Sequence, residues 1–117
     1  MKKEKWFLLQ EWVAEQLKPF DSYVRSTKGS GNSTEKGDLK FSKNLGLHIE
    51  CKCYNTKSPW NQDWLDKCSS EIPLHSDKTP IVVTENKEEK KVVHLYAEDF
   101  FEIYKQWYQM GESCNVG

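Results

Sequence analysis

The sequence predicts one α/β domain in which helices flank a mixed sheet of short strands. Three patterns support this prediction. Residues 4–17 repeat apolar side chains at helical spacing, residues 38–42 and 47–54 alternate polar with apolar side chains, and residues 80–84 (PIVVT) form the continuous apolar run typical of a buried strand. At 117 residues the chain can build one hydrophobic core but no separate recognition domain, so we expect residues 1–117 to form a single domain.

The first element is expected to be a helix over residues 4–17. Trp6, Leu9 and Val13 fall on one apolar stripe at helical spacing, and Pro19 follows where the helix should end. The acidic side chains of this segment lie largely on the opposite side. The stripe therefore predicts a helix that packs one face against the rest of the domain.

A strand is expected over residues 21–27, followed by a polar, glycine-rich segment over residues 28–37 (KGSGNSTEKG). Such a composition suits neither a helix nor a strand. The segment lacks the spacing of a P-loop, so a nucleoside triphosphate site is not indicated. Two interpretations stay open: a loop that wraps a nucleic-acid backbone, or a plain flexible connector.

Two strands joined by a tight turn are predicted over residues 37–54. Asn44 and Gly46 supply the turn, since both residue types accept the positive φ angle that tight hairpins need. In the second strand successive side chains point to opposite faces. The polar set that shares one face is His48, Glu50, Lys52 and Tyr54.

The register of this hairpin brings two carboxylates together. With residue 44 as the centre of symmetry, Asp38 faces Glu50 and Lys40 faces His48. Side chains directly opposite on antiparallel strands have Cβ atoms ~5 Å apart. Two carboxylates at that range repel each other, and a divalent cation removes the conflict.

This pair of acids predicts a metal site for phosphodiester hydrolysis. Asp38 and Glu50, with the backbone carbonyl of Cys51, offer the hard oxygen ligands that suit Mg²⁺. The ion lowers the pKa of a bound water and polarises phosphoryl oxygens. Lys52, one step along the same face, is expected to orient the attacking water or to neutralise charge on the phosphate. The alternative is an exposed sheet face decorated with charge.

The pattern Gly-Asp at 37–38 followed by Ile-Glu-Cys-Lys at 49–52 resembles the PD-(D/E)xK nuclease superfamily, whose motif is an Asp that opens one strand and a Glu-x-Lys on the next. Gly37 replaces the Pro of the nominal motif, as in the small resolvase branch. The order of elements is similar to that of archaeal and phage Holliday-junction resolvases. The resemblance implies a restriction-endonuclease-like α-β-β-β-α-β core, Mg²⁺ replaceable by Mn²⁺, and a homodimer that cuts DNA.

The resemblance also implies roles for residues outside the two strands. Similar nucleases carry a Glu on the first helix that reaches the metal site, and Glu11 is given that catalytic role here, with Gln10 as a polar alternative. Arg25 stands where similar resolvases place a phosphate-contacting Arg, and Gln62 matches a polar residue of the following helix. Further contacts to the DNA backbone are expected from Lys28, Ser30 and Lys36.

The net charge of −1 is low for a nucleic-acid-binding protein, but its distribution matters more than its total. Between residues 25 and 52, six basic residues stand against three acidic ones, two of which are the expected metal ligands. The face around the site is therefore expected to be basic once a metal ion is bound.

The second helix is expected to start with Ser58 as the N-cap and Pro59 as the first helical residue. Trp64 suits the core. Trp60 suits either the core or stacking on an exposed base.

After the apolar strand, another strand is predicted over residues 91–96 with His94 exposed, and then a helix over residues 97–110 that stops at Gly111. That helix carries more aromatic residues than are required to cover one face of a small sheet. Packing on the sheet and a dimer interface are the two interpretations. These residues are Phe100, Phe101, Tyr104, Trp107 and Tyr108.

The spacing of Cys51, Cys53, Cys68 and Cys114 fits neither a zinc finger nor a zinc ribbon. Buried free thiols explain these cysteines better, with a zinc module as the alternative.

From these observations we expect the protein to be a structure-specific DNA endonuclease that acts in DNA recombination, namely a Holliday-junction resolvase. Alternatives are a restriction-type, nicking or end-trimming nuclease of the same superfamily, and a non-catalytic nucleic-acid-binding protein on that scaffold. The sequence shows neither a membrane-spanning apolar run nor the shape of a signal peptide. We therefore expect no membrane partner and a cytoplasmic location, in the host cell if the protein is phage-encoded.

Overall fold

The structure is a computed structural model that describes residues 4–20, 25–26, 39–40 and 46–115. The elements within these residues follow the predicted order α-β-β-β-α-β-β-α. They are α1 (Lys5–Leu17), β1 (Arg25–Ser26), β2 (Leu39–Lys40), β3 (Leu47–Cys53), α2 (Gln62–Ser70), β4 (Thr79–Glu85), β5 (Lys91–His94) and α3 (Ala97–Asn115).

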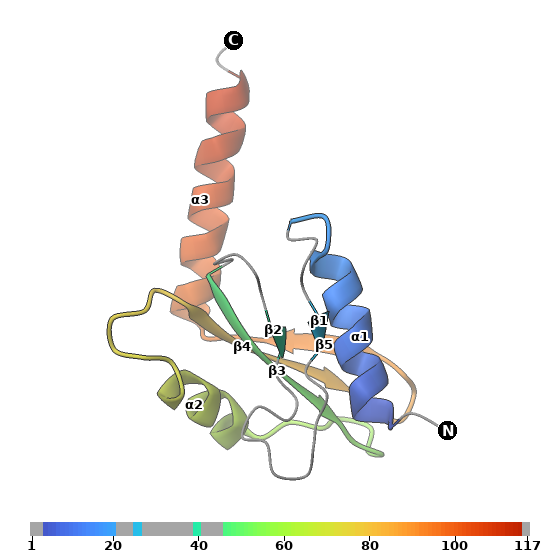
Figure 1. Cartoon of the computed structure of the whole chain (residues 1–117). Coiled ribbons are helices and arrows are strands. Elements are labelled where there is room, and N and C mark those ends of the chain that lie inside the picture. The colour runs from blue at the N-terminus through green and yellow to red at the C-terminus, as the bar shows by residue number, and fades with distance from the viewer. Residues whose placement is uncertain (1–3, 21–24, 27–38, 41–45, 116–117) are drawn as a thin grey trace.

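A three-stranded sheet in the order β3-β4-β5 forms the centre, with α1 and α2 packed on its two faces (Figure 1). β3 pairs in parallel with β4, and β4 pairs in antiparallel with β5. β1 and β2 form a separate two-stranded ladder. The predicted α/β class with a mixed sheet of short strands is therefore confirmed.

The middle strand, β4, is buried on both faces, which explains its continuous apolar sequence. Ile81 and Val83 pack towards α1, whereas Val82 packs towards α2. Because parallel strands cannot be joined by a short turn, the chain crosses over between β3 and β4 through α2. This crossover places α2 beside the polar face of β3.

The second helix begins later than predicted. Asn61, not Ser58, is its N-cap: the Asn61 backbone is extended, with φ −149° and ψ 119°, and its side-chain oxygen accepts a 2.9 Å hydrogen bond from the backbone N–H of Asp63. This bond satisfies a donor of the first helical turn that would otherwise lack a partner. Ser58 and Pro59 belong to the preceding connection.

The end of the chain differs from the prediction at two points. β5 ends at His94, because the carbonyl of Tyr96 already accepts a hydrogen bond from the N–H of Phe100 at the start of α3. α3 then continues through Gly111 to Asn115. A glycine inside a helix costs about 1 kcal/mol relative to alanine, which is not enough to end a helix of this length.

The predicted register between β2 and β3 is wrong where the structure describes it. Lys40 pairs with Arg25 of β1, and His48 pairs with Pro80 of β4. Within the described residues, β2 and β3 share no ladder. Residues 41–46 separate the two strands, a connection too long to impose a register as a two-residue turn does. Gly46 has the predicted positive angle, with φ +74°.

α3 projects away from the sheet (Figure 1). Its aromatic side chains are exposed, with Phe100 at 47% and Trp107 at 65% of their full accessible area. The interpretation that they pack on the sheet is therefore wrong. None of the described helices, α3 included, has the length and apolar character required to cross a membrane.

Candidate functional site

β3 presents Glu50 and Lys52 on the face that α2 partly covers. Glu50 is the register partner of Val82, which packs against α2. The Nζ atom of Lys52 lies 5.9 Å from the centre of the Trp64 ring on α2. The apolar side chains of β3 pack on the other face, towards α1, and confirm the predicted alternation. They are Leu47, Ile49, Cys51 and Cys53.

Glu50 and Lys52 form an ion pair along the strand. Nζ of Lys52 lies 3.1 Å from Oε1 of Glu50. The Glu50 side chain is 9% exposed and the Lys52 side chain 26% exposed. Water and salt screen such a partly buried pair less than a surface pair. The pair therefore holds a carboxylate in a fixed place, and the site remains open to solvent through the lysine.

The other carboxylate oxygen of Glu50 is left without a partner. Oε2 is buried and accepts no hydrogen bond from any described residue. Buried polar atoms are nearly always paired, because an unpaired carboxylate oxygen loses its hydration without compensation. A hard divalent cation satisfies such an oxygen. The donor that Glu50 offers therefore fits a Mg²⁺ ligand.

Gln10 is the buried polar residue of α1. Its side chain is fully buried, and neither amide atom has a hydrogen-bond partner among the described residues. Glu11 is partly exposed. α1 contacts β1 and β3, and on β3 it packs on the face opposite to Glu50 and Lys52. Burial on the α1 side does not by itself bring Gln10 to the site, and the roles given to Glu11 and to Gln10 both stay predictions.

Four rings form a continuous series beside Lys52, which we call the aromatic chain: Tyr54, Trp64, Trp60 and His94. Tyr54 stacks on Trp64 with centroids 5.1 Å apart, Trp60 meets Trp64 edge to face at 6.3 Å, and Trp60 stacks on His94 at 4.1 Å. Tyr54 and Trp60 are each 44% exposed. The aromatic chain therefore offers ring faces to a ligand next to the ion pair.

His94 is partly buried, so the prediction that it is exposed is wrong. Its Nε2 lies 2.9 Å from Oγ1 of Thr84, and Trp60 covers its ring. Burial lowers the pKa of His94 below the ordinary value of 6.5, so the ring is neutral at pH 7. The sequence carries no signal for this contact, since Trp60 and His94 come from different parts of the chain.

Several predicted site residues lie outside the described residues, or are described only in part. For Arg25 the structure describes the backbone alone, within β1. Gln62 is the exposed first residue of α2. The side chain of Cys51 is buried towards α1, so only its carbonyl remains a candidate ligand. The residues that fall outside are Lys28, Ser30, Lys36 and Asp38.

A metal ion bound to Glu50 would require a second ligand from outside the described residues. Within these residues, no three His, Cys, Asp or Glu side chains gather in a way that could hold a metal ion. Cys51 and Cys53 face α1, whereas Cys68 packs with Val82 on the opposite face. These three thiols therefore do not meet in one zinc site. Asp38 stays the predicted partner of Glu50.

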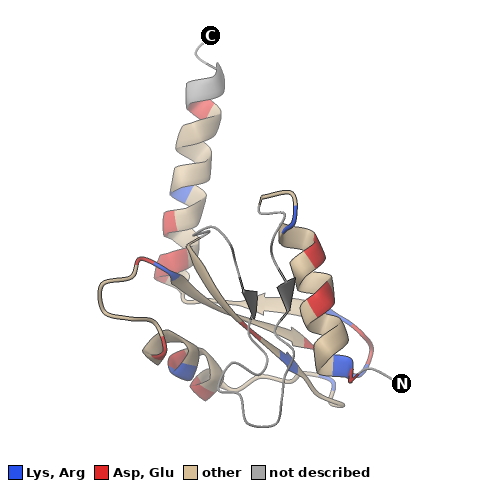
Figure 2. Ribbon diagram, in the orientation of Figure 1, with Lys and Arg blue, Asp and Glu red and all other residues tan. Residues whose placement is uncertain are grey.

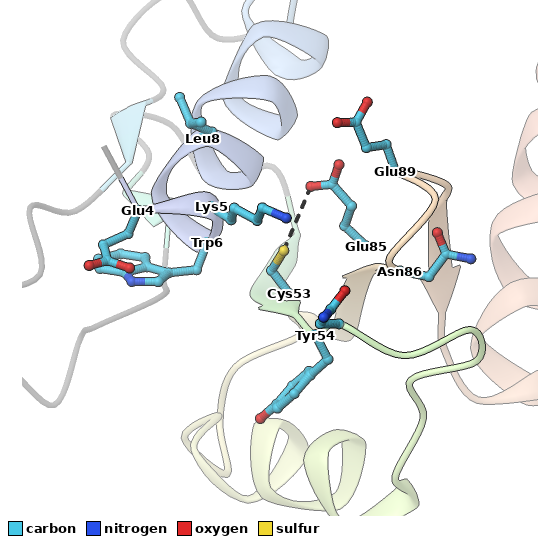
Figure 3. A pocket seen from close by; sticks show the side chains of 10 residues that line it. Glu4, Lys5, Trp6, Leu8, Cys53, Tyr54, Glu85, Asn86 and Glu89 are labelled. Atoms are coloured by element: carbon cyan, nitrogen blue, oxygen red, sulfur yellow. Dashed lines mark hydrogen bonds between the residues drawn. The ribbon is translucent and has the colours of Figure 1, made fainter. Parts of the chain in front are cut away.

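A separate pocket of about 390 Å³ lies at the carboxyl ends of β3 and β4, next to the start of α1 (Figure 3). Cys53 Sγ lies 3.9 Å from Oε1 of Glu85 in this pocket, and burial, with the charge of Glu85, raises the pKa of the thiol. Figure 3 shows the ring of Tyr54 turned away from Lys5 and Glu85. Glu4, Glu85 and Glu89 make the lining acidic, which disfavours a phosphate backbone. The pocket is therefore not part of the candidate site.

Comparison with known proteins leaves the family open. No family model matches the chain, and neither a curated protein nor a solved structure matches it. The resemblance to PD-(D/E)xK nucleases therefore depends on the Glu-x-Lys order and on the geometry around Glu50.

Proposed function

We propose that this chain is a Mg²⁺-dependent DNA endonuclease of the PD-(D/E)xK type that acts on branched DNA as a Holliday-junction resolvase does. The observation that carries the proposal is the state of Glu50. One oxygen is held by Lys52, two residues along the same strand face, and the other is buried without a partner among the described residues. In an ion pair on the protein surface with no functional role, both carboxylate oxygens would be exposed to water.

In this proposal Glu50, with Asp38 from beyond the described residues, holds the ion. When bound, Mg²⁺ supplies a Lewis acid and an activated water for phosphodiester hydrolysis. The ammonium of Lys52 stands beside the carboxylate and retains access to solvent. Its charge stabilises the negative charge that develops on the phosphoryl oxygens as the bond breaks. Trp64 limits the positions that this long side chain can adopt.

The aromatic chain supports a substrate with unpaired bases. Base-to-ring stacking contributes ~1–3 kcal/mol per base and needs a base that has left the duplex stack. Tyr54 and Trp60 expose ring surface within the same series of rings that Lys52 touches. Branch points supply such bases more readily than an intact duplex does. This arrangement favours a structure-specific nuclease over a sequence-reading restriction enzyme.

The test is cleavage of a four-way junction and of a linear duplex of the same sequence, with Mg²⁺, with Mn²⁺ and with EDTA. We expect metal-dependent cutting of the junction. Glu50→Gln and Lys52→Met should each lower the rate by about 100-fold or more. The matched controls are Glu85→Gln and Lys91→Met, since that ion pair has a similar 3.4 Å separation and partly buried side chains but lies at the acidic pocket.

Each alternative gives a distinct result. Equal cutting of junction and duplex rejects junction specificity and leaves a general nuclease. Binding of junctions without cleavage under any metal condition indicates the non-catalytic DNA-binding protein. Cutting that survives both Glu50→Gln and Lys52→Met rejects the site itself.

A further inference from the structure

No other described part of the chain covers the apolar face of α3. Seven large apolar side chains on this helix are each between 42% and 69% exposed. Four follow one another at intervals of three, four and three residues, which aligns them along the helix: Phe100, Ile103, Trp107 and Met110. Phe101, Tyr104 and Tyr108 widen the same side to about half of the circumference.

The rings of this face form a ridge. Phe100 and Tyr104 have centroids 6.3 Å apart, and Tyr104 and Trp107 have centroids 5.5 Å apart. The polar side chains Glu102, Lys105 and Gln109 occupy the opposite side. A helix with one apolar and one polar side is typically buried along its apolar side, because removing that surface from water is favourable, while the polar side stays in solvent.

From this face we infer that α3 pairs with α3 of a second copy of the chain, in antiparallel orientation. Side chains of this size that are about half exposed present roughly 700 Å² of mostly apolar surface. A stable interface of standard size buries about 800 Å² per partner. The helix face therefore supplies most of what a homodimer needs.

The residue sizes select the antiparallel orientation. It sets Phe100 opposite Met110 and Ile103 opposite Trp107, so that a bulky ring meets a smaller side chain each time. Parallel pairing sets Trp107 against Trp107.

Charge argues against the other occupants. α3 carries four acidic residues and a single lysine. Figure 2 shows this predominance of acidic (red) over basic (blue) residues along the helix. An acidic helix does not bind a phosphate backbone. Helices that lie on anionic membranes instead carry Lys and Arg on the polar side. The apolar face of α3 from a second copy of the chain is a suitable partner, because in antiparallel orientation the large and small side chains of the two faces lie opposite each other.

The pairing is inferred from α3 alone, whereas its use in DNA cutting rests on the proposed function. In each copy, the sheet with α1 and α2 connects to the first turn of α3. Antiparallel pairing of the two α3 helices therefore places the two sheets at opposite ends of the helix pair, related by a two-fold axis. Two active sites in that relation suit paired incision at a four-way junction.

The first test is the mass of the full chain by analytical ultracentrifugation across a range of concentrations. Wild type is expected to sediment at twice 13.8 kDa. Trp107→Glu or Ile103→Glu should weaken the dimer by about 30-fold or more. Gln109→Glu adds the same charge on the polar side and should remain dimeric. All three side chains are exposed on α3, and circular dichroism confirms that each variant folds.

A complementation test decides the orientation. Chains with Ile103→Glu mixed with chains with Trp107→Lys should recover the dimer mass, because only antiparallel pairing sets these two positions opposite each other. A wild-type monomer overturns the inference, as does equal weakening by Gln109→Glu. Failure of the mixture to recover the dimer overturns the antiparallel pairing. If the protein is monomeric and co-floats with phosphatidylcholine vesicles in a density gradient, the apolar face of α3 binds membranes and the inference of a dimer is overturned.

The outcome for this inference is separate from that for the proposed function. A dimer without nuclease activity leaves the α3 pairing in place and rejects the enzyme. A monomer that cuts junctions rejects the α3 pairing and leaves the proposed nuclease function in place.

Discussion

Trp60 and His94 stack with ring centroids 4.1 Å apart and rings only 14° from parallel. Trp60 precedes α2, and His94 ends β5, so this contact joins the crossover connection to the edge of the sheet. It also keeps the His94 ring partly out of water. The site that we propose for DNA is therefore bordered by a ring whose protonation state depends on the fold.

The first prediction concerns pH. Burial lowers the pKa of His94 in the folded protein below its ordinary value of 6.5. The unfolded chain then binds more protons as the pH falls below 6.5, so this contribution to stability is complete above 6.5 and is lost as the pH falls. One group changes the free energy of unfolding by at most about 1.4 kcal/mol per pH unit.

Urea unfolding between pH 5 and pH 7.5, followed by tryptophan fluorescence, measures this effect. His94→Gln should flatten the profile below pH 6.5. His75→Gln, in an exposed segment, is the control and should follow wild type. Identical slopes in wild type and His94→Gln would contradict the prediction.

The second prediction concerns the ion pair of β3. Lys52→Met leaves the Glu50 carboxylate buried without its cation and should lower the free energy of unfolding in EDTA by about 1–3 kcal/mol, a range reduced for the partial exposure of the lysine. Glu50→Gln should cost less, since it removes a charge whose second oxygen already lacks a partner among the described residues. Urea titration checks the order, and a larger loss in Glu50→Gln than in Lys52→Met would refute it.

The third prediction concerns the metal. Addition of Mg²⁺ or Mn²⁺ at constant ionic strength should raise the unfolding free energy of wild type by about 1–3 kcal/mol, since an ion that binds only the folded state stabilises it by mass action. Glu50→Gln should lose this gain, while Glu85→Gln should keep it. Because the readout is unfolding, it stands apart from cleavage. An equal gain in all three proteins would point to a metal site elsewhere or to a general salt effect.

The fourth prediction concerns Gln10. Its buried amide lacks partners among the described residues, so Gln10→Leu should leave the stability of the metal-free protein unchanged or raise it. If the amide serves the site, the same substitution should lower cleavage by about 10-fold or more. Gln16→Leu, on an exposed position of the same helix, is the control. Normal cleavage by Gln10→Leu would restrict this residue to a structural role.

The fifth prediction concerns the aromatic chain. Trp60→Ala and Tyr54→Ala should each weaken binding to a junction by about 10-fold, with a smaller effect on linear duplex, because each removes one stacking surface. Trp12→Ala is a matched control, since Trp12 is also 44% exposed but lies on α1, on the opposite side of the sheet. Fluorescence anisotropy with labelled DNA separates the two substrates. Equal losses on junction and duplex would contradict stacking on unpaired bases.

Local patterns in the sequence were sufficient to predict the helix of residues 5–17, the two faces of β3 and the buried strand β4. Each is set by a residue and its near neighbours, because helical and extended backbones repeat their side-chain directions at fixed intervals. The same reasoning placed Glu50 and Lys52 on one face and proposed Gln10 as an alternative to Glu11. It failed at α2, where Asn61 offers a cap closer to the apolar residues of the helix than Ser58 does.

Only the tertiary structure decided which strands pair and which side chains are buried. It paired Lys40 with Arg25 rather than His48, stacked Trp60 on His94, and left the aromatic face of α3 open. These outcomes depend on contacts between segments far apart in the chain, where many registers satisfy the same alternation and the one that buries the most apolar surface prevails. The sequence thus determined the chemistry carried by each face, and the fold determined which faces meet.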